Sequence, residues 1–225
     1  MKKFLVKTAA LLAAAAMTVS SVSCSSSGKK SSKANSNNLA GGDIPDDLEI
    51  SLEDMPYGGE YKRLTPSDSD VPIGVEFDPR FMTDEEAKKV VDYFYSLSSG
   101  ETARLENAVA PELLKYRLET SELESAQAFL DAEYELIKQY TQADFSFKFV
   151  LVDGVLKGDS GYEAYDALVK KAMPDAKVTE KKAFKINCTY ERPDDIGSTY
   201  SLALRLGDDV TVAVYTIDGE PYVIS

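Results

Sequence analysis

The sequence predicts an α+β fold in which N-terminal helices pack on one face of a curved antiparallel sheet. Apolar residues recur at helical spacing between residues 83 and 141, and they alternate with polar residues in most of the chain after residue 145. A run of helices followed by a run of strands is typical of α+β proteins. Residues 43–225 are numerous enough to form one domain with a substantial core.

The first predicted helix begins after Thr83. Residues 83–86 read Thr-Asp-Glu-Glu, which has the form of a capping box with acidic residues in the first turn. One apolar stripe follows at spacings of three and four residues, and it consists of Ala87, Val90, Val91, Phe94 and Leu97. The sequence Ser-Ser-Gly at residues 98–100 predicts the end of this helix.

Further helices are predicted between residues 102 and 141. A second helix from Thr102 is interrupted near Pro111, which suits the first turn of a new segment that runs to Leu118. Thr120 or Ser121 is then expected to cap a long helix that ends at about Thr141. The residues of this helix predicted to face the core are Ala126, Phe129, Leu130, Ile137 and Tyr140.

A change to a period of two marks the first predicted strand after the helices. Phe145, Phe147, Phe149 and Leu151 form one apolar face of it. Asp153-Gly154 predicts a hairpin turn into a short strand over residues 155–157. A short helix is expected after residues 158–161, and Pro174 is expected to close it. Its apolar residues are Tyr165, Leu168, Val169 and Ala172.

Strands are predicted for the rest of the chain. Two of them have apolar faces formed by Phe184, Ile186, Cys188 and Tyr190, and by Tyr200, Leu202, Leu204 and Leu206. A third is predicted over Val210–Ile217, after Gly207-Asp208-Asp209. Asp218-Gly219 then predicts a turn into a last strand over Tyr222–Ile224.

The order of these elements resembles the cone-shaped α+β fold of the nuclear-transport-factor-2-like (NTF2-like) superfamily. The resemblance covers residues 83–225, and the long helix that ends near Thr141 departs from the simplest version of the fold. It implies helices packed on one face of a curved sheet. The superfamily includes ligand-binding domains, isomerases and dehydratases, so the resemblance alone does not choose a function. Its enzymes usually place His and Asp in the cone, and this chain has no histidine.

The first 23 residues have the pattern of a secretory signal peptide. Lys2, Lys3 and Lys7 precede a mostly apolar run from Leu11 to Val19, and small residues follow. The apolar run is too short for a permanent transmembrane helix. The sequence therefore predicts export across the cell membrane.

Cys24 is the predicted site of lipid attachment. Ser21-Val22-Ser23-Cys24 resembles the signal of bacterial lipoproteins, with Ser21 where Leu or Val is usual. The resemblance implies a diacylglyceryl group on the Cys24 thiol, a mature chain that begins there, and anchoring on the extracytoplasmic face of the cell membrane. The alternative is an ordinary secretory cleavage near Ser21 or Ser23, which would leave a free thiol.

Two segments connect this signal to the predicted domain over residues 83–225. Residues 24–42 are rich in Ser, Asn, Gly and Lys, and we expect a disordered linker because they contain almost nothing to bury. Residues 43–82 are rich in Pro, Gly and Asp. We expect them to form an extended lead-in that lies over the domain, with its scattered apolar residues docked.

The charge of the chain excludes one class of partner. The net charge is −13, and all 38 acidic residues follow Gly42, whereas six of the 25 basic residues precede it. Nucleic acid is therefore not expected as a partner, because phosphate binding needs a basic face. An acidic surface favours cations or basic partners instead.

Composition also excludes several mechanisms. Without histidine, neither a Ser-His or Cys-His nucleophile nor an imidazole metal site can form. Cys188 is in phase with apolar strand residues, so we expect a buried and unreactive thiol. Acidic pairs at Asp68 and Asp70, Asp194-Asp195 and Asp208-Asp209 could bind calcium, but they lie at predicted turns and lack the spacing of a calcium loop.

These observations favour a membrane-anchored lipoprotein with a non-catalytic domain that binds a small molecule or another envelope protein. No cofactor or metal site is predicted. The alternative is an enzyme that uses carboxylates and tyrosines in a cone-shaped pocket. A deep pocket with two converging acids whose pKa values differ would favour catalysis, and a filled cone would favour binding alone.

Overall fold

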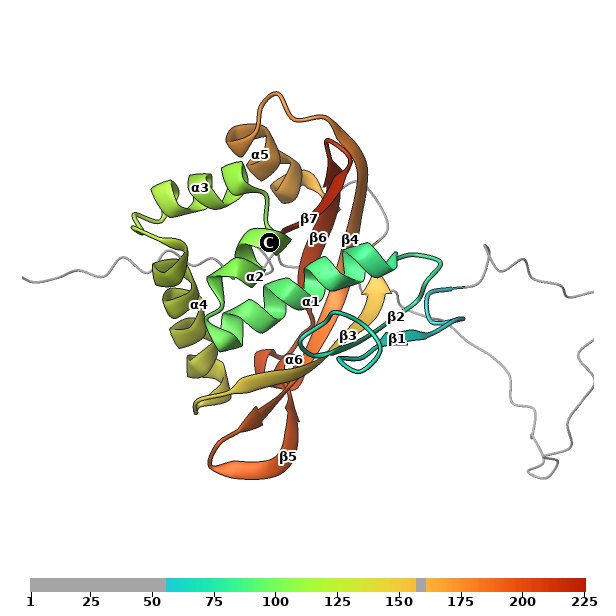
Figure 1. Cartoon of the computed structure of the whole chain (residues 1–225), viewed down its shortest axis with the longest axis vertical. Helices are drawn as coiled ribbons and strands as arrows, with labels where there is room; N and C mark the ends of the chain where they lie inside the picture. Colours follow the sequence, from blue (N-terminus) through green and yellow to red (C-terminus); the bar gives the residue numbers. More distant parts are fainter. Residues whose placement is uncertain (1–55, 157–160) are drawn as a thin grey trace, which may run out of the picture.

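The computed structural model describes residues 56–156 and 161–225. Cys24, the predicted signal and linker, and residues 43–55 and 157–160 lie outside the described residues. The described part is an α+β fold with one sheet, in the strand order β1-β2-β3-β4-β6-β7, and β5 pairs with β4 beyond the end of β6. Helices α1 to α4 lie together on one side of this sheet (Figure 1). None of the helices in the described residues has the length and apolar character needed to span a bilayer.

Helix α1 (Asp84–Ser99) is confirmed in both bounds and orientation. The Thr83 hydroxyl accepts a hydrogen bond from the backbone N–H of Glu86, and the Glu86 carboxylate accepts one from the backbone N–H of Thr83. Gly100 ends the helix with a φ of 75°, a conformation that glycine adopts without strain. The predicted apolar stripe is buried, and the helix contacts β2, β3 and β7.

The interruption at Pro111 is confirmed, but the long helix begins later than predicted. Helix α2 (Thr102–Ala108) precedes α3 (Pro111–Thr120), and α4 spans Ala126–Thr141. Glu122 has a φ of 56°, and the backbone N–H of Leu123 bonds back to the carbonyl of Leu118, which terminates α3. Ser125 then caps α4 in place of Thr120 or Ser121. Tyr140 is 41% exposed and does not face the core as expected.

Strand β3 (Ser146–Val155) corrects the predicted apolar face. Phe147 pairs with Tyr190 and Phe149 with Thr189, so Lys148 is an extra residue in a β-bulge. A bulge shifts the alternation by one residue. Phe147 therefore shares its buried side with Val150 and Val152, whereas Phe149 and Leu151 are only partly buried.

The hairpin predicted at Asp153-Gly154 does not form. Strand β3 continues to Val155, which pairs with Phe184, and a second register shift lies between Val152 and Gly154. The helix expected after residues 158–161 is confirmed as α5 (Glu163–Ala172).

The end of the chain is predicted well except at one apolar segment. Strands β4 (Val178–Arg192), β6 (Val210–Ile217) and β7 (Glu220–Ile224) follow the expected pattern. Strand β5 spans only Asp195–Ser201, and residues expected to extend it form helix α6 (Leu202–Leu206). The Ser201 hydroxyl caps this helix, and Leu204 is 84% exposed because it lies on the helix side opposite buried Leu202.

Part of the predicted lead-in belongs to the sheet. It supplies β1 (Lys62–Leu64) and β2 (Gly74–Phe77), which pair antiparallel with each other. Strand β2 runs parallel to β3, so the sheet is mixed and the expectation of an antiparallel sheet was wrong. The chain between these two strands passes through four helices, a connection long enough to bring it back in the same direction.

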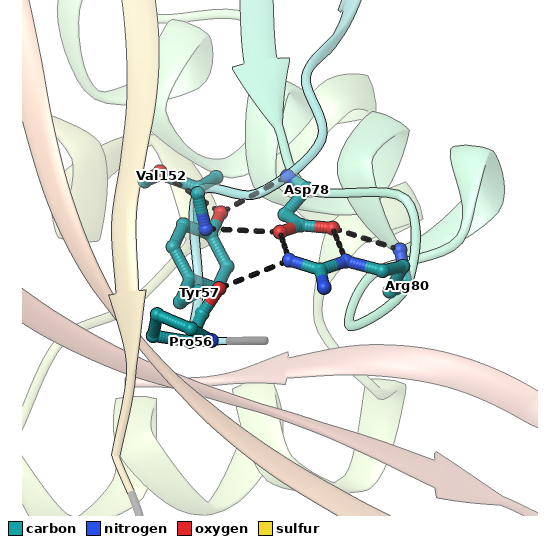
Figure 2. Close-up of polar contacts among 6 residues, drawn as sticks. Pro56, Tyr57, Asp78, Arg80 and Val152 are labelled. Atoms are coloured by element: carbon teal, nitrogen blue, oxygen red, sulfur yellow. Dashed lines mark hydrogen bonds and ion pairs between the residues drawn. The ribbon is translucent and has the colours of Figure 1, made fainter. Parts of the chain in front are cut away.

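A buried carboxylate attaches the start of this segment to the sheet. The Asp78 side chain is fully buried and accepts hydrogen bonds from the backbone N–H of Gly58 at 2.9 Å and from Arg80 Nε at 2.9 Å. The Tyr57 hydroxyl donates to the carbonyl of Val152 at 2.9 Å (Figure 2). The Arg80 side-chain hydrogen bond is the main cause of a pKa of about 2 for Asp78, and the backbone N–H of Gly58 also lowers this pKa.

Candidate functional site

A cavity of about 60 Å³ lies among α1, α3, α4, α5, α6 and β6. Most of its wall is apolar, and the residues that form this wall include Phe94, Leu97, Ile137, Leu202 and Val212. Four buried side chains with polar groups also line it: Tyr93, Arg117, Glu133 and Tyr165. An apolar cavity with a few converging polar groups is the usual form of a small-molecule site.

Arg117 reaches the cavity from the last turn of α3. It follows Leu113 and Leu114 at spacings of four and three residues, so the helix turns it toward the same side as these buried leucines. The residue is only 6% exposed, and its Nε has no hydrogen-bond partner in the described structure. The guanidinium group of arginine is a cation, so this site contains a buried positive charge.

Glu133 reaches the cavity from the middle of α4. It lies between Leu130 and Ile137 on the buried side of the helix and is 7% exposed. Burial raises the pKa of its carboxyl group, and the charge of Arg117 partly offsets this effect. Glu133 and Arg117 interact through space, and in the described residues they form no direct ion pair.

The two tyrosines are neutral hydrogen-bonding groups. Burial, with a smaller effect from Glu133, raises the pKa of Tyr93 to about 12, and this hydroxyl is hydrogen-bonded with Ser225. Burial also raises the pKa of Tyr165, whose hydroxyl donates to the carbonyl of Thr211 at 3.1 Å. Neither tyrosine can therefore act as a base near neutral pH.

The few polar groups and the small volume of the cavity limit the chemistry that it can support. Of the side chains that line it, only that of Glu133 has a carboxyl group, whereas glycosidase-type mechanisms need two. The free volume is also well below the ~300–1,000 Å³ of pockets for larger ligands. The space between the helices and the sheet is thus largely filled, with room for a small molecule.

The residues singled out in the sequence lie elsewhere. Cys24 is outside the described residues. Cys188 is buried on β4, as expected, and burial raises the pKa of its thiol well above the usual value. It does not line the cavity.

The acidic pairs take part in local hydrogen bonds at turns. Asp68 accepts from the Thr65 hydroxyl, Asp194 from Arg192, and Asp208 from the backbone N–H of Asp209. Over residues 56–156 and 161–225, no group of three or more Cys, Asp or Glu side chains is arranged to hold a metal ion.

The sequence reasoning missed both charged residues of the cavity, although a signal for each was present. Glu133 lies in phase with the apolar residues of α4, and Arg117 with those of α3. A charged residue within an apolar helical stripe is either paired or functional, because burial of an isolated charge is unfavourable. Sequence motifs alone do not reveal this pattern.

No protein-family model, curated protein or solved structure matches this chain. The function must therefore be inferred from the cavity and from the N-terminal sequence. Fold alone would not decide it in any case, because one fold supports many functions.

Proposed function

We propose that this chain is a lipid-anchored lipoprotein of the extracytoplasmic face, whose domain binds a small molecule in the Arg117–Glu133 cavity without transforming it. The observation that carries the proposal is the buried Arg117, whose Nε lacks a hydrogen-bond partner in the described structure, together with a buried carboxyl group, that of Glu133, in the wall of the same cavity. A bound ligand would supply the missing partners.

The energetic reason is the cost of burying charge. A charged group left without a partner in a protein interior typically costs several kcal/mol. Arg117 and Glu133 offset only part of this cost for each other, because they interact through space and not through a direct hydrogen bond. The presence of two buried charges in such an arrangement is better explained by ligand binding than by a contribution to stability.

Binding is a better account than catalysis. The enzyme alternative needs an acid and a base of different pKa, or an activated nucleophile. The side chains that line the cavity include one carboxyl group and two tyrosines that stay neutral. These groups therefore support binding of a ligand in the cavity rather than its chemical conversion.

The NTF2-like architecture and the lipid anchor are parts of the same proposal. The helices on one side of the sheet and the cavity between them support a cone-shaped fold of this kind. The N-terminal pattern that ends at Cys24 supports anchoring at the outer side of the cell membrane. A domain held there would sample molecules that reach the envelope.

Ligand capture tests the binding function. The full chain, purified in detergent, would be analysed by native mass spectrometry after exposure to a metabolite extract. We expect at least one small molecule to bind to the unmodified chain and to be lost from Arg117→Met. Lys115→Met, on the exposed side of the same helix, is the matched control and should keep the ligand. Absence of any bound molecule, or equal retention by Arg117→Met, would contradict the proposal.

A further inference from the structure

We infer that the ligand is a small zwitterion of the α-amino acid class, with its carboxylate on Arg117 and its ammonium group on Glu133. This inference rests on the proposed function and specifies the chemistry of the same site. It follows from three properties of the cavity: a buried cation, a buried carboxyl group separate from it, and a small volume.

The Arg117 guanidinium defines the first end of the ligand. It presents N–H donors in a planar fork that matches a carboxylate. Its Nε is fully buried without a partner, and Ser225, which also lines the cavity, bonds to Tyr93 and not to Arg117. A ligand carboxylate would satisfy these donors and neutralise the charge.

Glu133 defines the second end. An ionised carboxylate only accepts hydrogen bonds, and Glu133 interacts with Arg117 by charge alone, without a hydrogen bond to it. An ammonium group supplies up to three donors and a compensating positive charge. Glu133 and Arg117 line the same cavity and form no direct ion pair in the described residues, so one ligand can contact both.

Ligands with a single charge fit this arrangement less well. A simple carboxylic acid would pair with Arg117 but would place a second negative charge near Glu133 and leave that carboxylate without a donor. A simple amine would pair with Glu133 and leave Arg117 without an acceptor. Only a molecule with both a carboxylate and an ammonium group supplies a partner for both Arg117 and Glu133. A site that hydrogen-bonds a polar group of its ligand rejects analogues without that group, because its own buried groups are then left unpaired.

The volume limits the size of the side chain. A single water needs about 10–15 Å³ of such free volume, so 60 Å³ admits about four to six non-hydrogen atoms. Glycine and alanine are of this size. The apolar wall, which includes Phe94 and Leu97 of α1, suits hydrogen or methyl as the side chain rather than a polar group.

A ligand series tests the inference without any mutation. Isothermal titration calorimetry on the full chain at pH 7 would compare glycine and alanine with propionate and with ethylamine. We expect alanine or glycine to bind at least about tenfold more tightly than either single-charge compound, as loss of one charged hydrogen-bonding group predicts. Propionate or ethylamine binding as tightly as alanine would overturn the inference, as would failure of both amino acids to bind.

Matched variants locate the binding. Glu133→Gln should weaken amino-acid binding by about tenfold or more, whereas Glu135→Gln, exposed on the same helix, should leave it unchanged. Equal binding by Glu133→Gln and the unmodified chain would overturn the inference. A captured molecule that is not a zwitterion, and that is lost from Arg117→Met, would overturn this inference and leave the proposed binding function intact.

Discussion

Phe94 of α1 and Phe147 of β3 pack edge to face, with ring centroids 6.3 Å apart and ring planes inclined at 83°. Phe147 also contacts Phe145 in the same way, and the Phe145 ring meets that of Tyr190 on β4. This aromatic series joins the helices to the sheet. The two layers therefore share one core, and Phe94 also forms part of the cavity wall.

Truncation of Phe94 should destabilise the whole domain. Phe94→Ala removes a buried ring that packs between the helices and the sheet. Such changes typically lower the free energy of unfolding by about 3–5 kcal/mol. We expect a single cooperative thermal transition at a lower temperature. Leu204→Ala is the control, because this residue was expected in the core but is largely exposed on α6. Two separate transitions in either protein would contradict a shared core.

The Asp78–Arg80 pair should make stability depend on pH in acid. The pKa of Asp78 is lowered in the folded protein to about 2 from an ordinary value of 3.8. Its contribution is therefore present above about pH 4 and is lost as the pH falls toward 2. Urea unfolding between pH 5 and pH 2 should show a steeper loss of stability for the unmodified chain than for Asp78→Asn. Equal pH profiles would show that this carboxylate does not contribute.

Cys188 should be unreactive in the folded protein. Its side chain is fully buried, and burial raises the pKa of the thiol, so little thiolate is available. In a variant that lacks Cys24, a thiol reagent should label the chain only after denaturation. Cys188→Ala should cost on the order of 1 kcal/mol through a small cavity. Rapid labelling under native conditions would be inconsistent with the structure.

Cys24→Ser should release the protein from the membrane. The predicted diacylglyceryl group places two acyl chains on this residue, and each chain contributes about 0.8 kcal/mol of membrane binding for every buried methylene group. We expect the variant in the soluble fraction with an unchanged thermal transition. Unchanged membrane retention of the variant, or a mature N-terminus at Ser25 or later, would contradict lipid attachment at Cys24.

Elements with strong local signals were predictable, and those that depend on pairing were not. The capping box at Thr83 and the turn at Asp218-Gly219 define their elements through neighbouring residues alone. The bulge at Lys148 is visible only when β3 is aligned with β4. Leu202, Leu204 and Leu206 have the period of a strand, yet the Ser201 and Gly207 caps give a helix instead.

The candidate site was less predictable than the fold. Arg117 and Glu133 come from different helices, and no spacing in the sequence shows that they line the same cavity. Their positions within apolar stripes could have marked them as buried charges. Whether the two side chains line one cavity depends on how α3 and α4 pack against each other, which only the folded structure shows.

The parallel pairing of β2 with β3 has a consequence for folding kinetics. Val75 pairs with Val150, so this contact closes a loop that contains α1 to α4. Contacts between residues so distant in the chain cost more loop entropy than the hairpin of β6 and β7, whose two strands are adjacent in the sequence. We therefore expect β1 and β2 to join the sheet after the folding transition state. Val75→Ala should then accelerate unfolding and leave the refolding rate nearly unchanged in stopped-flow experiments, whereas slowed refolding would place this edge in the folding nucleus.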